Sequence, residues 1–125
     1  MSGKYKDELG LIVMNNCKEF GEKIDKNIMG KRNKEESFII PTDVVRFNNG
    51  EGKCVLEESV RDMDIYIITD VGNYDITYKA QRGVHHMMPD EHYQDLKRII
   101  SAIGGHARKL TLIMPLLYQS RQDKR

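Results

Sequence analysis

The sequence predicts an α/β fold in which a mostly parallel sheet is flanked by helices in three layers. Three apolar stretches of strand length, at 11–16, 64–70 and 109–115, are rich in Ile, Leu and Val. A stretch with the apolar spacing of a helix follows the first of them, and another precedes the third. Strands that alternate with helices are typical of parallel sheets, so we expect ligands to bind beyond the carboxyl ends of these strands.

Length and composition indicate one soluble domain over 1–125. The chain has 125 residues, of which 39% are hydrophobic and 31% charged, enough for a core and unlike a disordered segment. Its net charge of +1 gives no electrostatic reason to bind nucleic acid or an anionic membrane. No apolar run approaches the roughly 20 residues of a membrane span, and the first residues lack the apolar core of a secretory signal. We read Cys17 and Cys54 as reduced thiols rather than a disulfide, which favours the cytoplasm.

The first predicted strand, "LIVMNN", leads into a helix. Asn16 is expected to cap this helix, with Glu19 three residues later as in a capping box. Gly30 is expected to end it. Its apolar face, at helical spacing, consists of Phe20, Ile24 and Ile28.

A β-hairpin is predicted near 44–57. The segment 38–47 is extended but interrupted by Pro41, so it forms either an edge strand or two short strands. "NNGEG" at 48–52 is a strong turn signal, and "KCVLE" at 53–57 alternates as a returning strand does.

The segment 71–88 shows no clear periodicity and is expected to be an irregular loop. Pro89 is then expected at the first position of a second helix, with Asp90 and Glu91 in its first turn. The pair of glycines at 104–105 ends this helix. Its apolar face consists of Leu96, Ile99, Ile100 and Ile103.

Short catalytic and nucleotide-binding motifs are absent from the sequence. It contains no G-x-x-x-x-G-K-[ST], no G-x-G-x-x-G and no G-x-S-x-G. "HHMM" together with His92 and His106 matches no metal-ligand spacing, so these histidines are expected in solvated or loop-packing roles. We therefore assign no catalytic residue and no metal ligand in this chain.

Two stretches have side chains suited to a nucleotide. "RFNNGE" at 46–51 combines a ring that can stack on a base with amide and carboxylate groups for hydrogen bonds. "SRQDKR" at 120–125 has guanidinium groups for phosphate oxygens, and a Gln and an Asp for a sugar or for waters around a metal ion. By composition alone, each is more often a solvated turn or tail, and both interpretations stay open.

In order and separation, these stretches resemble the ribose-phosphate diphosphokinases, also called phosphoribosyl diphosphate synthetases. The family pattern runs from R-F-x-D-G-E through E-E-S-V-R and a helix with L-K-R to a strand ending in Pro and R-Q-D-[RK]-[KR]. Here these motifs read "RFNNGE", "LEESVRDMDIYIITD", "DLKRIISAIGGHARKLTLIMP" and "SRQDKR", within 44–125. The resemblance implies a phosphoribosyltransferase-like N-terminal domain.

Enzymes of this family transfer the diphosphoryl group of ATP to the 1-hydroxyl of ribose 5-phosphate, with Mg²⁺. The resemblance implies that Phe47 stacks on adenine and that Glu51 accepts from its amino edge. It also implies that Arg121 and Gln122 contact the same ATP from another subunit, so that a homo-oligomer shares the site. The implied ATP-binding residues are Phe47, Asn49, Gly50, Glu51, Arg121, Gln122 and Asp123.

The chain departs from the family pattern in three respects. Asn49 replaces the hairpin Asp, which affects nucleotide preference, and the connection over 74–92 is longer and more polar than usual. The family's metal-binding His, its catalytic Lys-Arg loop and its acidic ribose-phosphate motif have no match here. We therefore expect 1–125 to be the N-terminal, ATP-binding half of a longer enzyme, inactive by itself. A non-catalytic regulatory or assembly subunit is the alternative, and RNA binding through "RQDKR" is disfavoured by the near-neutral charge.

Overall fold

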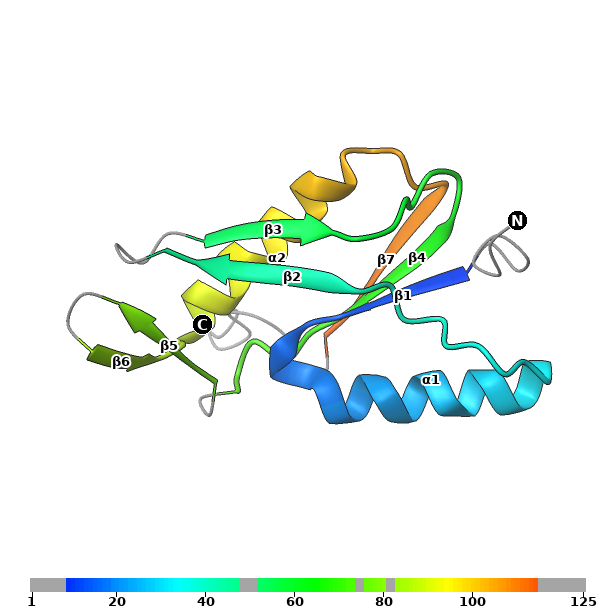
Figure 1. The fold of residues 1–125 in the computed structure, drawn as a ribbon, viewed down its shortest axis with the longest axis horizontal. Coiled ribbons are helices and arrows are strands. Elements are labelled where there is room, and N and C mark those ends of the chain that lie inside the picture. The colour runs from blue at the N-terminus through cyan, green and yellow to red at the C-terminus, as the bar shows by residue number, and fades with distance from the viewer. Residues whose placement is uncertain (1–8, 48–51, 74–75, 81–82, 115–125) are drawn as a thin grey trace, which may run out of the picture.

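A computed structural model describes residues 9–47, 52–73, 76–80 and 83–114. Within them, the chain forms two helices and seven strands, and five of the strands lie between the two helices in sequence (Figure 1). They are β1 Leu9–Val13, α1 Lys18–Arg32, β2 Thr42–Arg46, β3 Gly52–Leu56, β4 Asp64–Ile68, β5 Thr77–Ala80, β6 Gly83–His86, α2 Pro89–Ile103 and β7 Lys109–Ile113; a short 3₁₀ turn, Asn15–Cys17, precedes α1.

The centre of the fold is a parallel sheet in the order β1-β4-β7. Ile67 of β4 lies between Ile12 of β1 and Leu112 of β7, so the three strands start and end at the same edges. The predicted α/β fold with a parallel sheet is therefore confirmed. β4 and β7 follow the predicted apolar runs, because continuous runs of branched residues suit a strand with neighbours on both faces. β1 lies two residues earlier than the predicted 11–16, and the end of that run forms the 3₁₀ turn Asn15–Cys17 instead.

The sheet lies between two covering layers, as predicted. On one face, α1 approaches β1 closely where Gly21 meets Val13. On the other face lie α2 and the β2–β3 hairpin (Figure 1). Burying an aliphatic side chain between these layers contributes about 1.5–3 kcal/mol. The buried core here consists of Ile12, Met14, Ile40, Val60, Met63, Ile65, Ile67, Leu96, Ile99 and Ile103.

The strand β7 is less buried than the sequence predicted. Leu110 and Leu112 remain 40% and 44% exposed. Among the described residues, β7 pairs with β4 alone and therefore lies at an edge of the sheet. The predicted position of the third strand is thus confirmed. The prediction that this strand is fully buried is wrong for the described part of the chain.

The helix α1 extends beyond its predicted end. It continues through Gly30 to Arg32, and its C-cap Asn33 adopts the left-handed conformation (φ 57°, ψ 44°) and donates its N–H to the Gly30 carbonyl. Asn is tolerated there because its short polar side chain reduces the steric cost. Phe20 is 47% exposed, so the buried face is narrower than predicted. The fully buried positions of this face are Gly21 and Asp25.

Two antiparallel hairpins complete the fold. β2 pairs with β3 as predicted, and Ile39 forms a separate parallel bridge to Leu11, so Pro41 separates two short extended segments. A second hairpin, β5–β6, lies in the segment predicted to be irregular. That prediction was wrong because the signal is weak: polar and apolar residues alternate over only four positions in β5, and β6 has no such alternation. Their side-chain partners lie instead on α2 and across the hairpin.

Candidate functional site

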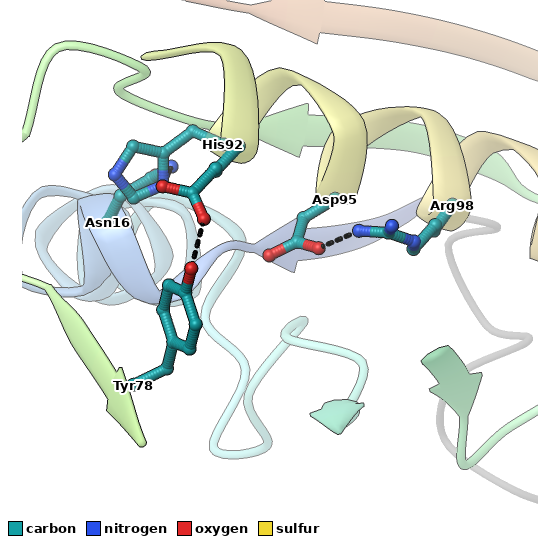
Figure 2. Close-up of polar contacts among 6 residues, drawn as sticks. Asn16, Tyr78, His92, Asp95 and Arg98 are labelled. Atoms are coloured by element: carbon teal, nitrogen blue, oxygen red, sulfur yellow. Dashed lines mark hydrogen bonds and ion pairs between the residues drawn. The ribbon is translucent and has the colours of Figure 1, made fainter. Parts of the chain in front are cut away.

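The carboxyl edge of the sheet holds a buried polar cluster, which we call the Asn16–His92 cluster: Asn16, Thr69, Asn73 and His92. Asn16 lies in the turn after β1, Thr69 and Asn73 follow β4, and His92 lies in the first turn of α2. Figure 2 shows the His92 ring next to Asn16. Three elements that are distant in sequence therefore meet at the edge where open α/β sheets bind ligands.

The hydrogen bonds of Asn16 define its orientation. Its Oδ1 accepts from the backbone N–H of Asp70 at 2.8 Å and from the Thr69 hydroxyl at 3.1 Å. The amide group Nδ2 therefore points to Nδ1 of His92, 3.0 Å away. A backbone N–H can only donate, so turning the Asn16 amide over would set two donors against each other.

This orientation also assigns the tautomer of His92. Because Nδ2 of Asn16 donates, Nδ1 of His92 must accept and carries no proton. The other ring nitrogen, Nε2, lies 2.7 Å from the carbonyl oxygen of Asn73, which can only accept. The network thus requires neutral imidazole with its proton on Nε2.

Two sequence predictions fail at this cluster. Asn16 does not cap α1: Cys17 occupies the N-cap position, and Asn16 is buried with its side chain turned toward β4 and α2. His92 is neither solvated nor in a loop, since it is 2% exposed on the buried face of α2. A signal for the second was present in the sequence, because His92 precedes Leu96, Ile99 and Ile103 at helical spacing.

The β5–β6 hairpin is attached to the same end of α2. The Tyr78 hydroxyl donates to the carboxylate of Glu91 (Figure 2). The same carboxylate accepts the backbone N–H of Met88 at 3.0 Å. The Tyr78 ring also stacks on His85 across the hairpin, with ring centroids 5.5 Å apart. Glu91 and His92, adjacent in sequence, therefore hold the hairpin and the 69–73 loop respectively.

The inner face of the β2–β3 hairpin contains a thiol that is held protonated. Burial, and secondarily the charge of Asp95, raises the pKa of Cys54 to about 11. Asp95 is itself buried and pairs with Arg98 of the same helix, with 2.6 Å between Nη1 and Oδ1 (Figure 2). Cys54 therefore packs the hairpin against α2 and is unsuited to act as a nucleophile at neutral pH.

The "EESVR" motif lines an open hollow of about 360 Å³ at the opposite, amino end of β4. Ser59 and Arg61 contribute to it, and His106 lies on the α2 side. Glu57 also lines this hollow, and its partner Asp43 lies on strand β2 of the β2–β3 hairpin. The pKa of the exposed Glu57 is raised, first by its hydrogen bond with Asp43 and then by the charge of that carboxylate. The motif thus lies away from the carboxyl edge of the sheet.

Of the seven predicted ATP-binding residues, the structure describes Phe47. Its ring is 47% exposed at the end of β2. Figure 1 shows this end of the hairpin on the side of the molecule toward which the parallel strands run. Six other predicted ATP-binding residues lie outside the described residues: Asn49, Gly50, Glu51, Arg121, Gln122 and Asp123.

Within the described residues, no three His, Cys, Asp or Glu side chains are grouped closely enough to hold a metal ion. Likewise, neither of the described helices has the length and apolar character needed to cross a membrane.

A family model for the "N-terminal domain of ribose phosphate pyrophosphokinase" matches residues 9–125. The chain belongs to this family. The match includes β1 and the hairpins as well as the two nucleotide-like stretches. It also includes the parallel sheet and both helices, so the resemblance noted from short motifs extends over the whole fold.

Individual ribose-phosphate pyrophosphokinases are similar to parts of the chain. Ribose-phosphate pyrophosphokinase 1 of Schizosaccharomyces pombe is 36% identical over 89 residues, covering 69% of this chain and 18% of that protein. Ribose-phosphate pyrophosphokinase A of Dictyostelium discoideum is 30% identical over 83 residues, covering 66% of this chain and 22% of that protein. The chain therefore spans about a fifth of the length of these curated relatives.

The fold agrees with a solved structure of the same family. The crystal structure of phosphoribosylpyrophosphate synthetase from Mycobacterium smegmatis superimposes with a TM-score of 0.68 over 94% of this chain and 33% of that chain. The sequence identity is 21%. The predicted phosphoribosyltransferase-like N-terminal fold is thereby confirmed.

Proposed function

We propose that the chain is the ATP-binding, N-terminal half of a ribose-phosphate diphosphokinase. This enzyme transfers the β,γ-diphosphoryl group of ATP to the 1-hydroxyl of ribose 5-phosphate and makes 5-phosphoribosyl 1-diphosphate for nucleotide synthesis. The observation that carries the proposal is the family match over residues 9–125, which includes both nucleotide-like stretches. The proposed setting is the cytoplasm, and the free thiols of Cys17 and Cys54 support it.

The proposed role of these residues is positioning rather than covalent chemistry. Diphosphoryl transfer needs the attacking hydroxyl in line with the leaving oxygen and neutralised phosphate charge. In this proposal Arg121, Gln122 and Asp123, which follow β7, contact ATP at the carboxyl edge of the sheet. Mg²⁺ would accompany the phosphates of ATP, because the described residues form no metal-binding group of their own.

The exposed ring of Phe47 supports a site shared between subunits. A Phe side chain that is 47% exposed leaves a face of the ring open to a base. The ring lies at the end of a hairpin that extends from the sheet, so in the proposed homo-oligomer it reaches adenine bound mainly by a neighbouring copy (Figure 1). Asn49, Gly50 and Glu51 of the same turn would hydrogen-bond the base.

Calorimetric titration of ATP·Mg²⁺ into the full-length protein tests this assignment. Stacking of a base on an aromatic ring is worth about 1–3 kcal/mol, so Phe47→Ala is expected to weaken ATP binding by about tenfold or more. Arg121→Ala is expected to weaken it as well, through loss of a phosphate contact. Phe20→Ala is the matched control, because Phe20 is also 47% exposed but lies on α1.

Each part of the proposal has a result that would contradict it. If Phe47→Ala and Arg121→Ala both bind ATP as the parent does, the site assignment fails. If light scattering finds the full-length protein monomeric while it turns over, the shared site fails. A full-length protein that binds ATP and assembles but makes no 5-phosphoribosyl 1-diphosphate would instead be a regulatory subunit. Turnover by residues 1–125 alone would contradict their assignment as half of the enzyme.

A further inference from the structure

Buried polar side chains are concentrated at the carboxyl edge of the sheet. The described residues include five of them, Asn16, Asp25, Thr69, His92 and Asp95. Three of the five belong to the Asn16–His92 cluster. Buried polar groups are costly unless hydrogen-bonded, and an aliphatic cluster would meet the needs of packing alone. We therefore expect the Asn16–His92 cluster to have a role beyond packing.

The cluster holds one short segment, the loop 69–73 that follows β4. Its Thr69 hydroxyl and Asp70 N–H donate to the side chain of Asn16. Nδ2 of Asn73 donates to the Asn16 carbonyl oxygen at 2.9 Å. The Asn73 carbonyl oxygen accepts from Nε2 of His92 at 2.7 Å. The loop is therefore tied to the exit of β1 and to the first turn of α2.

This loop begins beside the exit of β7. The backbone N–H of Thr69 donates to the carbonyl oxygen of Ile113, the last residue of β7, at 3.1 Å. The residues that follow β7 in sequence lead to Arg121–Asp123, the proposed contacts for ATP. A shift of the loop would therefore act directly on the point where the chain enters the proposed nucleotide-binding segment.

We infer that His92 is a positioning residue of the nucleotide site: through Asn16 and Asn73 it holds the 69–73 loop against the exit of β7. The inference rests on the proposed function and names a residue of that site outside the two nucleotide-like stretches. Because His92 is buried, we assign it no contact with ATP. Its effect passes through its hydrogen bonds to Asn16 and Asn73.

Histidine suits this role because its ring presents an acceptor and a donor to two different partners at once. Neutral imidazole accepts from Asn16 at Nδ1 and donates to Asn73 at Nε2. A substituted Asn could replace the acceptor near Nδ1, and a Gln the donor near Nε2, but neither reaches both partners. A Leu replaces neither and leaves the Asn16 amide without its acceptor.

Steady-state kinetics of the full-length protein test the role. For His92→Leu we expect the KM for ATP to rise about tenfold. The substitution leaves the buried Asn16 amide without its hydrogen bond, and the loss of one such bond corresponds to about a tenfold change in an equilibrium constant. The KM for ribose 5-phosphate is expected to stay within about twofold of the parent value, since the loop adjoins the nucleotide segment. His92→Asn keeps an acceptor for Asn16 and is expected to lie between the parent and His92→Leu.

Asp25→Asn is the matched control. Asp25 is also buried and accepts two hydrogen bonds, from the Ser37 hydroxyl and the Phe38 N–H, but it ties α1 to the segment before β2. It is expected to lower stability and leave both KM values unchanged. A purely structural His92 would behave in the same way, so an unchanged KM for ATP in His92→Leu overturns the inference. A parallel rise in both KM values overturns it as well.

If His92→Leu does not fold, His92→Asn decides the question, and a KM for ATP equal to the parent's then overturns the inference. Nitrogen-15 NMR of the parent protein offers a measurement without catalysis and is expected to show the proton of His92 on Nε2. A proton on Nδ1 would overturn the hydrogen-bond directions and the inference with them. A parent that binds no ATP overturns the proposed function itself, whereas normal turnover with an insensitive His92→Leu overturns the positioning role alone.

Discussion

Gly21 lets α1 pack directly on β1, and replacing it should measurably weaken the fold. A Cβ at position 21 would lie no more than 2.5 Å from either γ-carbon of Val13 and 2.9 Å from its Cβ. Because Val is β-branched and its own Cβ is among the contacts, a rotamer change cannot relieve the clash. The helix must move instead, and such overpacking costs about 1–3 kcal/mol; contacts this short with three atoms of Val13 place Gly21→Ala in the upper part of that range, about 2–3 kcal/mol.

Gly21→Ala is therefore expected to destabilise the chain. Ala is favoured over Gly inside a helix by about 1 kcal/mol, so the net loss of unfolding free energy is about 1–2 kcal/mol. For a domain of this size, that loss lowers Tm by about 4–8 °C. Thermal unfolding followed by circular dichroism measures it.

Gly30→Ala is the matched control on the same helix. A Cβ at position 30 meets nothing within 4 Å. This substitution should therefore raise the unfolding free energy by about 0.5–1 kcal/mol. In a Val13→Ala background, Gly21→Ala should lose most of its penalty, which a double-mutant cycle would report. A Gly21→Ala chain as stable as the parent would refute the reasoning.

Two other predictions concern a thiol and a helix end. Because the pKa of Cys54 is raised to about 11, the thiol should react with iodoacetamide at pH 8 about ten- to hundredfold more slowly than in the denatured chain. The same shift means that the unfolded state loses this proton first. The contribution of Cys54 to stability should thus decline as pH rises from 9.0 toward about 11, and Cys54→Ser should remove that part of the decline. Rapid iodoacetamide labelling of Cys54 in the folded chain would contradict its burial. At the end of α1, Asn33→Ala should cost about 1 kcal/mol, because Ala tolerates the left-handed conformation less well, while the nearby Lys31→Ala should be close to neutral in urea unfolding.

The sequence predicted those features that depend on local signals. The three parallel strands were found because each is a short run of branched apolar residues. The helix α2 was found at the correct start, because Pro89 and two acidic residues mark its first turn. The β2–β3 hairpin followed from the turn signal between two extended segments.

The errors arose where distant partners compete with local preferences. Asn16 has the chemistry of a helix cap, yet its side chain bonds Thr69 and His92, 53 and 76 residues away. The β5–β6 hairpin is supported by Tyr78 bonding to Glu91 on α2, which no periodicity within the hairpin reveals. For the site, sequence resemblance indicated the two nucleotide-like stretches, but it did not indicate the buried polar cluster.

By itself, the sequence determined the order and type of the principal elements and the family to which they belong. This was possible because apolar strand segments, turn residues and family motifs each consist of residues that are consecutive in the sequence. Only the tertiary structure decided which polar groups meet at the carboxyl edge of the sheet. That arrangement depends on the parallel register of β1 and β4 and on the packing of α2 against them, which bring Asn16, Thr69 and His92 together from three separate segments.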